Sequence, residues 1–164
     1  MNSILFICIG NICRSPMAEG FLKRALPDKA VLSAGINALD YTPADPLSVQ
    51  LMREHGIDIS AHRARSLATW MVNDADVILT MDGWQKRFIE INYPDSKCKV
   101  FRLCEGGKCD VPDPYRQGLA AFRHACNLIS LGVDELVLRL ACTGEDGMRN
   151  DLAIIREKQE IISQ

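Results

Sequence analysis

An unbroken apolar run near the start of the chain, residues 4–9, leads through a short polar loop into a helical pattern. A run of this kind is typical of a strand that is buried on both faces, as strands are in a parallel sheet. The helical pattern, residues 16–26, has proline in its first turn, where proline is tolerated, and Ser15 before it as a plausible N-cap. A buried strand followed at once by a helix predicts the first unit of an α/β fold.

The same order of strand and helix recurs along the chain. The longest helical pattern, residues 116–140, spaces its apolar residues by alternating steps of three and four, which predicts a helix with one face on the core. Strands that alternate with helices predict an open four-stranded parallel sheet with helices on both faces, and we expect the order 2-1-3-4. The predicted strands are residues 4–9, 30–33, 77–81 and 99–103, and the other predicted helices are residues 46–55, 67–72 and 84–91.

Length and composition are those of an ordinary soluble globular protein. Of 164 residues, 48% are hydrophobic and 24% are charged, and the formal net charge is −2. The basic residues form no run, which argues against a nucleic-acid surface. No apolar stretch approaches the ~20 residues of a membrane span. We expect one domain, residues 1–141, and a C-terminal extension, residues 142–164, with a short helix at 152–162.

The N-terminus and the cysteines indicate a cytoplasmic protein. The first positive charge, Arg14, comes after the apolar run, so we expect no signal peptide. Without export, the seven cysteines are expected to be reduced thiols. Cys104 and Cys109, with His124 nearby in sequence, do not have the spacing of a known zinc finger, and we expect no metal.

The loop after the first strand, CIGNICRS at residues 8–15, combines a thiol with groups that bind anions. Such a loop gathers backbone N–H groups in one concavity, and the helix dipole adds about half a positive charge. Arg14 offers a planar fork for two phosphate oxygens, and Ser15 can donate a hydrogen bond to a Cys8 thiolate. Because a thiolate is a nucleophile, the loop can bind a phosphate group and attack it. The alternative is a buried structural cysteine in an ordinary turn.

A candidate acid for the leaving oxygen lies in DVPDPY, residues 110–115. Asp113 stands between two prolines, which stiffen its loop and can hold its carboxyl group in one place. It follows the fourth predicted strand, so it should reach the same edge of the sheet as Cys8. Asp-Pro is also a common turn opener, which is the alternative interpretation. Tyr115 could form an apolar wall against an aromatic substrate or could simply pack.

Together, CIGNICRSPMAE at residues 8–19 and DPY at 113–115 resemble the low-molecular-weight protein tyrosine phosphatases. The resemblance covers about residues 3–140 and includes SAG at 33–35, ADP at 44–46, HRAR at 62–65 and ILTM at 78–81. It implies that Cys8 is the nucleophile that forms a cysteinyl-phosphate, that Arg14 clamps the phosphate, and that Asp113 is general acid and then general base for water. Ser15 would stabilise the thiolate.

The resemblance also implies roles for residues around the loop. Asn11, Ser33 and His62 resemble the polar network that holds the loop in shape, and Leu39 and Tyr115 lie where the family builds its cleft walls. The remaining phosphate-binding positions would be Ile9, Gly10, Ile12 and Cys13.

Cys13 has a second expected role, because it is a thiol in the same loop as Cys8. A sulfenic acid formed on Cys8 by peroxide could condense with it to a reversible disulfide. The alternative is that Cys13 merely packs as a small apolar residue.

The short loops resemble the bacterial branch of the family, which often acts on tyrosine autokinases of capsule or exopolysaccharide export. The resemblance therefore implies a phosphotyrosine protein as the substrate, with such an autokinase as the candidate. We expect a monomer that needs no cofactor, does not insert into membranes and does not bind nucleic acid.

Two other functions compete with the phosphatase. Thioredoxin-linked arsenate reductases share the fold and a very similar cysteine loop, but their first relay cysteine follows the third strand, where this chain has Met81. Cys104 and Cys109 come one strand later, and the DPY motif favours the phosphatase. A module that holds phosphotyrosine without cleaving it would lack the nucleophile or the acid, and both are present.

Overall fold

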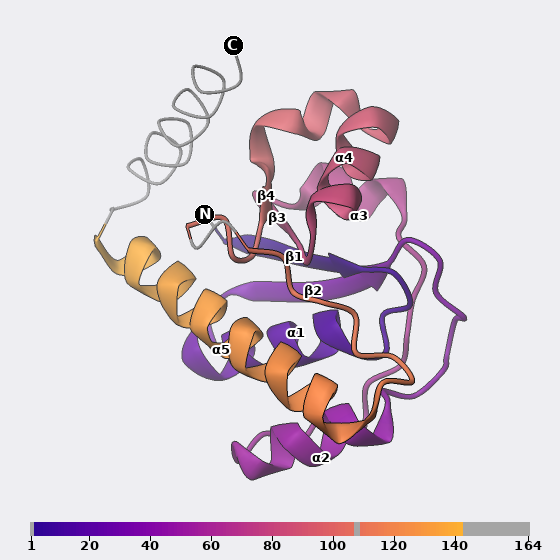
Figure 1. Ribbon diagram of the computed structural model, residues 1–164. Coiled ribbons are helices and arrows are strands. Elements are labelled where there is room, and N and C mark those ends of the chain that lie inside the picture. The colour runs from indigo at the N-terminus through magenta and orange to yellow at the C-terminus, as the bar shows by residue number, and fades with distance from the viewer. Residues whose placement is uncertain (1, 107–108, 143–164) are drawn as a thin grey trace.

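The computed structural model describes residues 2–106 and 109–142, in which four parallel strands form one sheet between two layers of helices (Figure 1). The sheet order is β2-β1-β3-β4, which confirms the predicted fold class and strand order. The strands are β1 Ser3–Cys8, β2 Ala30–Gly35, β3 Val77–Thr80 and β4 Val100–Arg102. The helices are α1 Arg14–Ala25, α2 Pro46–Glu54, α3 Thr69–Asp74, α4 Gly83–Asn92 and α5 Gly118–Cys142, and a 3₁₀ helix, η1 Pro94–Lys99, precedes β4.

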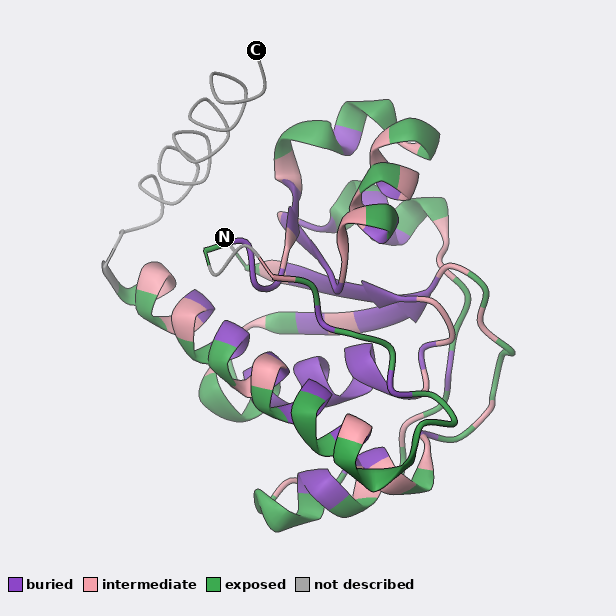
Figure 2. Ribbon diagram, in the orientation of Figure 1, coloured by how far each residue is buried: buried purple, intermediate pink, exposed green. Residues whose placement is uncertain are grey.

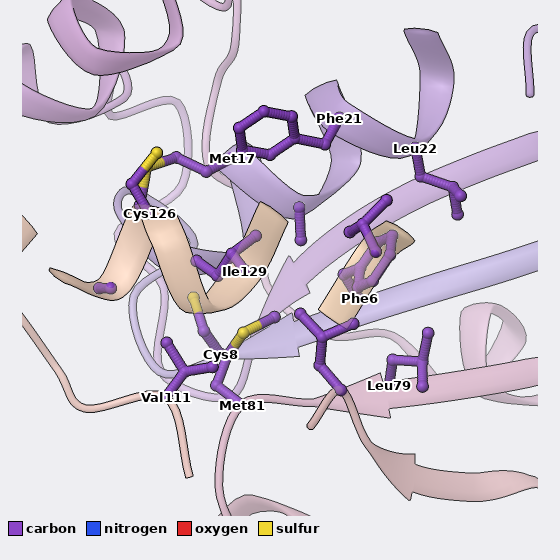
Figure 3. Packing of buried hydrophobic residues seen from close by; sticks show 14 of the residues in the cluster. Phe6, Cys8, Met17, Phe21, Leu22, Leu79, Met81, Val111, Cys126 and Ile129 are labelled. Atoms are coloured by element: carbon purple, nitrogen blue, oxygen red, sulfur yellow. The ribbon is translucent and has the colours of Figure 1, made fainter. Parts of the chain in front are cut away.

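Strand β1 lies between β2 and β3 and is buried on both faces (Figure 2). Its side chains alternate between two cores: Phe6 and Cys8 pack in the core formed with α1, α2 and α5, and Leu5 and Ile7 pack in the core formed with α3 and α4. Figure 3 shows Phe6 and Cys8 in the first core, with Ile129 of α5. Because both faces are covered, the strand is an unbroken apolar run, and each buried aliphatic or aromatic side chain contributes about 1.5–3 kcal/mol.

Helix α5 crosses α1 and α2 and covers the first core (Figure 1). Its predicted apolar stripe is buried from Phe122 to Leu136, whereas Leu119 is exposed. The predicted start at residue 116 is wrong, because Arg116 and Gly118 adopt left-handed φ angles of 61° and 83° and the helix begins at Gly118. Gly132 allows close packing, since a Cβ there would lie 2.8 Å from Leu103 Cγ.

The other predicted elements differ from the structure by one or two residues at their ends, and the starts of α3 and β4 differ for local reasons. Helix α3 begins two residues later than predicted, because Ser66 forms a bridge with Gly35 and the Leu67 N–H donates to the Gly35 carbonyl. Strand β4 begins after Lys99, which belongs to η1, a helix that the sequence did not indicate.

The carboxyl-terminal end of β3 is hydrogen-bonded to the chain that follows β4. The Leu103 N–H donates to the Thr80 carbonyl and the Val111 N–H to the Met81 carbonyl, both at 2.8 Å. The segment that carries Asp113 is therefore tied to the end of β3, beside the loop that follows β1.

The expected C-terminal extension, including its short helix at 152–162, lies outside the described residues apart from Cys142, so the domain boundary at residue 141 stays a prediction. Within residues 2–106 and 109–142, no helix is both long and apolar enough to cross a membrane. In the same part of the chain, no group of three or more His, Cys, Asp or Glu residues is placed to hold a metal ion.

Candidate active site

The loop between β1 and α1 surrounds the sulfur of Cys8 with hydrogen-bonding groups. Cys8 is the last residue of β1 and is buried. Its Sγ accepts from the Asn11 N–H at 3.2 Å and lies 2.9 Å from Ser15 Oγ. The N-cap of α1 is Cys13, so the prediction that Ser15 caps the helix is wrong: its hydroxyl is inside the first turn and faces the sulfur. The sulfur thus lies among a hydroxyl and a backbone amide that can donate hydrogen bonds to a nucleophilic sulfur.

Asn11 holds this loop in shape with all of its polar atoms. It has a left-handed φ of 54°, a conformation that asparagine tolerates better than most residues, and it is completely buried. Its Nδ2 donates to Ser15 Oγ at 2.9 Å and to Ser33 Oγ at 2.8 Å. Its Oδ1 accepts from the Arg65 N–H at 3.0 Å, and its backbone carbonyl accepts from His62 Nε2 at 2.8 Å. The structure thus brings Asn11, Ser33 and His62 together, as the family resemblance implies.

His62 supports the loop as a neutral imidazole. Burial lowers its pKa below the ordinary value, although the hydrogen bond to Asn11 and the nearby Glu19 carboxylate act in the opposite direction. The ring is therefore uncharged at neutral pH. Because the Asn11 carbonyl can only accept, the Nε2 atom carries the proton.

Gly35 lies directly beneath the loop. A Cβ at this position would be 2.6 Å from the Ile9 carbonyl oxygen and 2.9 Å from Ala38 Cβ. We expect Gly35→Ala to displace the loop and to lower kcat/KM by about tenfold or more, since overpacking of 1–3 kcal/mol corresponds to that loss. Gly83→Ala is the matched control, because a Cβ there meets no atom within 4 Å. Steady-state assays that find equal activity in the two variants would contradict this role of Gly35.

Arg14 and Asp113 meet at the mouth of the loop. Arg14 is the first residue of α1 and only 3% exposed. Its Nη2 donates to Asp113 Oδ2 at 2.8 Å, and its Nη1 donates to the Val111 carbonyl at 3.0 Å. The other Asp113 oxygen accepts from the Tyr115 N–H at 3.2 Å. A half-exposed carboxyl group is thus held beside a buried guanidinium group, within reach of the concavity.

Asp82 is a site residue that the sequence analysis missed. It caps α4 by accepting from the Gln85 N–H at 2.8 Å, and it pairs with Arg14 Nη1 at 3.2 Å. The sequence does mark Asp82 as a helix cap, because Asp-x-x-Gln directly after a predicted strand resembles a capping box. The end of that strand lies at the same edge of the sheet as Cys8.

Glu19 is a second missed residue. It is buried on α1, where its carboxylate accepts from Ser33 Oγ and Lys23 Nζ, each at 2.5 Å. Through Ser33 it extends the network that surrounds Asn11. No sequence pattern singles it out, because the contact depends on how α1 lies across β2.

A cleft of about 330 Å³ leads from the surface to the sulfur of Cys8. Leu39 and Tyr115 stand in its wall, and both are well exposed, at 78% and 47%. Asn37 and Thr42 also contribute, which the sequence did not indicate. The lining residues are Cys8, Ile9, Gly10, Ile12, Cys13, Arg14, Asn37, Leu39, Thr42, Asp113 and Tyr115.

The arrangement suits transfer of a phosphoryl group to sulfur. A nucleophile lies at the closed end of the cleft, a nest of N–H groups and a guanidinium group can hold phosphate oxygens, and a carboxyl group stands where a leaving oxygen would pass. Cys104 and Cys109 do not line the cleft, and the Cys104 thiol donates to the Leu128 carbonyl of α5 instead.

Comparison with known proteins agrees with this geometry. A family model described as low molecular weight phosphotyrosine protein phosphatase matches residues 3–145. A relative from Ralstonia solanacearum, the probable low molecular weight protein-tyrosine-phosphatase EpsP, is 51% identical over 88% of this chain and 99% of its own length.

Solved structures are similar in fold over most of the chain. Vibrio vulnificus Wzb in complex with benzylphosphonate is 35% identical and has a TM-score of 0.82, over 85% of this chain and 99% of that one. The YwlE arginine phosphatase from Geobacillus stearothermophilus is 32% identical and also has a TM-score of 0.82, over 87% and 94% of the two chains. The family model that matches residues 3–145 and the 51% identical relative show that this chain belongs to the low molecular weight phosphotyrosine protein phosphatase family.

Proposed function

We propose that this protein is a protein-tyrosine phosphatase that hydrolyses phosphotyrosine through a cysteinyl-phosphate on Cys8. One observation carries the proposal: the Cys8 sulfur lies at the closed end of a cleft, among hydrogen-bond donors, with Arg14 and Asp113 joined at 2.8 Å beside it. The family match and the tyrosine phosphatase relatives support it.

The first half-reaction forms a bond between Cys8 and phosphorus. The thiolate attacks the phosphorus atom, and the bond from phosphorus to the tyrosine oxygen breaks. Asp113 donates its proton to that oxygen, so that tyrosine leaves as a neutral phenol. In the second half-reaction, the Asp113 carboxylate takes a proton from water, whose oxygen attacks phosphorus. The sulfur–phosphorus bond breaks, and free phosphate and the thiolate are restored.

Arg14 links phosphate binding to the acid. Its guanidinium group pairs with Asp113 and Asp82. A bound phosphate dianion competes for the same N–H groups and satisfies them bidentately. Asp82, which also caps α4, keeps the arginine positioned beside the loop.

The cleft walls favour a flat aromatic ester. Ile12, Leu39 and Tyr115 offer apolar surface above the sulfur, and Asp113 is the sole carboxylate among the lining residues. We expect kcat/KM on phosphotyrosine peptides to exceed that on matched phosphoserine and phosphoarginine peptides by at least about 100-fold. The shorter serine ester cannot bring phosphorus to Cys8, and arginine has no aromatic ring to pack against Leu39 and Tyr115. Phosphate release from the three peptides measures the ratio. Comparable rates on phosphoserine would refute the aromatic preference, and faster release from phosphoarginine would assign the YwlE-type activity instead.

Arsenate reduction is less well supported. The position that follows β3 is Met81, which is buried and has no thiol. Cys104 and Cys109 are outside the cleft, so a disulfide relay from Cys8 would have to reach thiols that do not line it. The Ralstonia relative is named as a probable protein-tyrosine-phosphatase, and the Geobacillus structure is an arginine phosphatase.

Cys13 is proposed to protect Cys8 during oxidation. It lies in the cleft lining at the start of α1, and burial, followed by the nearby Asp45 and Cys8, raises its pKa well above the ordinary value of a thiol. Peroxide therefore oxidises Cys8 to a sulfenic acid before it oxidises Cys13. The Cys13 sulfur then attacks the Cys8 sulfur, the hydroxyl group leaves with the Cys13 thiol proton as water, and a disulfide forms.

We expect peroxide to inactivate the wild type reversibly and phosphate to protect it. Cys13→Ser should keep most activity, because serine is a favoured N-cap residue at this position, but should regain far less activity after reduction with dithiothreitol. Cys98→Ser, at an exposed cysteine, is the matched control and should recover like the wild type. Full recovery of the Cys13→Ser variant would exclude Cys13 as the resolving thiol.

The physiological setting is also part of the proposal. We propose a bacterial tyrosine autokinase of exopolysaccharide or capsule export as the substrate protein, acted on by a monomeric cytoplasmic enzyme without a cofactor, as the family resemblance of the sequence implies. Relatives named EpsP and Wzb are low molecular weight protein-tyrosine-phosphatases, which agrees with a phosphotyrosine protein as the substrate. The test is release of phosphate from a purified, autophosphorylated tyrosine kinase of exopolysaccharide or capsule export from the bacterium that produces this protein. Failure to dephosphorylate it, with full activity on phosphotyrosine peptides, would reject that partner alone.

A further inference from the structure

A second cavity, which we call the α1 cavity, lies between helix α1 and the segment 56–65. Its volume is about 660 Å³, twice that of the catalytic cleft, and it shares no lining residue with that cleft. Pockets of roughly 300–1,000 Å³ are the usual size for small-molecule ligands. Its lining residues are Pro16, Glu19, Gly20, Lys23, Arg24, Gly56, Ile57, Asp58, Ile59, Ala61, His62, Arg63 and Arg65.

The lining of the α1 cavity is positively charged in a chain whose net charge is −2. Lys23 and three arginines contribute four positive charges, and Glu19 and Asp58 contribute two negative ones, which leaves a surplus of two. Both carboxylates are already engaged. Glu19 accepts from Lys23 and Ser33, and Asp58 accepts from the Ser60 N–H.

The three arginines keep donors available for a ligand. Arg63 donates to the Ser60 and His62 carbonyls, and Arg24 donates to the His55 carbonyl, so each uses only part of a guanidinium group with five N–H bonds. The Arg65 side chain makes no hydrogen bond or ion pair within residues 2–106 and 109–142. Grouped guanidinium groups bind phosphate oxygens bidentately, whereas Ile57 and Ile59 add aliphatic surface to the same cavity.

The wall of the α1 cavity is also the support of the catalytic loop. His62 Nε2 donates to the Asn11 carbonyl at 2.8 Å, and the Arg65 N–H donates to Asn11 Oδ1 at 3.0 Å. From the opposite wall, Glu19 reaches Asn11 through Ser33. A ligand that moves these groups therefore acts on the residue that shapes the loop around Cys8.

We propose that the α1 cavity binds a small molecule with several phosphate groups, an oligophosphate or a nucleotide, and that its occupancy is transmitted to the catalytic loop through His62, Arg65 and Asn11. The site is separate from the one that hydrolyses phosphotyrosine. Oligophosphates and nucleotides both carry the phosphate oxygens that Arg24, Arg63 and Arg65 can bind.

The test uses the full ¹⁵N-labelled chain with its catalytic cleft saturated by benzylphosphonate, so that added phosphate groups cannot bind beside Cys8. ATP and tripolyphosphate are titrated separately, with a chelator and at constant ionic strength. We expect saturable binding with a Kd below about 1 mM and a shift of the Asn11 amide resonance. Comparable affinities identify an oligophosphate site, and tighter binding of ATP identifies a nucleotide whose base rests on the aliphatic surface.

Two double variants separate a specific site from general charge attraction. Arg24→Gln with Arg63→Gln should weaken binding at least tenfold. Arg87→Gln with Arg123→Gln removes the same charge from exposed positions outside the α1 cavity and should change the Kd by less than about twofold. Thermal melting checks that both variants fold. Absence of binding, or equal weakening in both variants, would contradict a phosphate-binding site in the α1 cavity. Saturable binding that leaves the Asn11 resonance unmoved would contradict an effect of the ligand on the catalytic loop.

Discussion

The Cys8→Ser variant is expected to lose turnover of phosphotyrosine by roughly 10⁴-fold or more while it keeps the fold and binds the substrate. A serine hydroxyl holds its proton at neutral pH. The groups that contact the Cys8 sulfur are the backbone N–H of Asn11 and the hydroxyl of Ser15, and neither is a base that could remove that proton. The phosphate-binding groups remain, so the Kd of a phosphotyrosine peptide should change by no more than a few-fold. Quenched-flow kinetics and calorimetric titration measure the two quantities.

The matched control for this variant is Cys98→Ser. Cys98 is exposed in η1 and does not line the cleft, so its replacement should leave kcat/KM unchanged. Substantial residual turnover by Cys8→Ser, well above that of contaminating host phosphatases, would remove the sulfur from the role of nucleophile.

The Asp113→Asn variant is expected to slow turnover selectively for poor leaving groups. An amide cannot donate a proton as a carboxylic acid does, and a phenol of pKa ~10 needs that proton more than a nitrophenol does. We therefore expect kcat to fall about 10²–10³-fold on phenyl phosphate and much less on nitrophenyl phosphate. Stopped-flow assays with the two esters give the ratio.

Asp110→Asn is the control for this second variant. Asp110 lies three residues before Asp113 but pairs with Arg102 at 3.0 Å and accepts from the Gly83 N–H, outside the cleft. Its replacement should affect both esters alike and only slightly. Equal losses on the two esters in Asp113→Asn would exclude Asp113 as the acid.

The fold and the centre of the site could be predicted because their signals are local. An unbroken apolar run indicates a strand buried on both faces. CIGNICRS begins at the end of that run, so strand, loop and helix start are contiguous in the sequence. Asp113 could be predicted as the acid because it stands in a stiff Pro-Asp-Pro segment after the last strand. Parallel order then brings both segments to one edge of the sheet.

The two missed residues contact the site through segments that are distant in sequence: a local pattern marks Asp82 only as a helix cap, and no local pattern marks Glu19. Glu19 matters because α1 crosses β2 where Ser33 points toward it, and Asp82 matters because the buried Arg14 side chain reaches the end of β3. For Ser15, a local pattern was present but gave a wrong prediction. Ser-Pro before a helix indicates an N-cap, but the loop places the serine in the first turn, where its hydroxyl serves the Cys8 sulfur.

The covalent intermediate offers the most direct test of the account. Wild-type enzyme is mixed with a phosphotyrosine peptide, quenched in denaturant within the first turnover, digested and mapped by mass spectrometry. We predict one phosphoryl group per chain on the peptide that contains Cys8, formed at least as fast as phosphate is released. Phosphate release with no phosphorylated enzyme, or a phosphoryl group on any residue other than Cys8, would contradict the proposed mechanism.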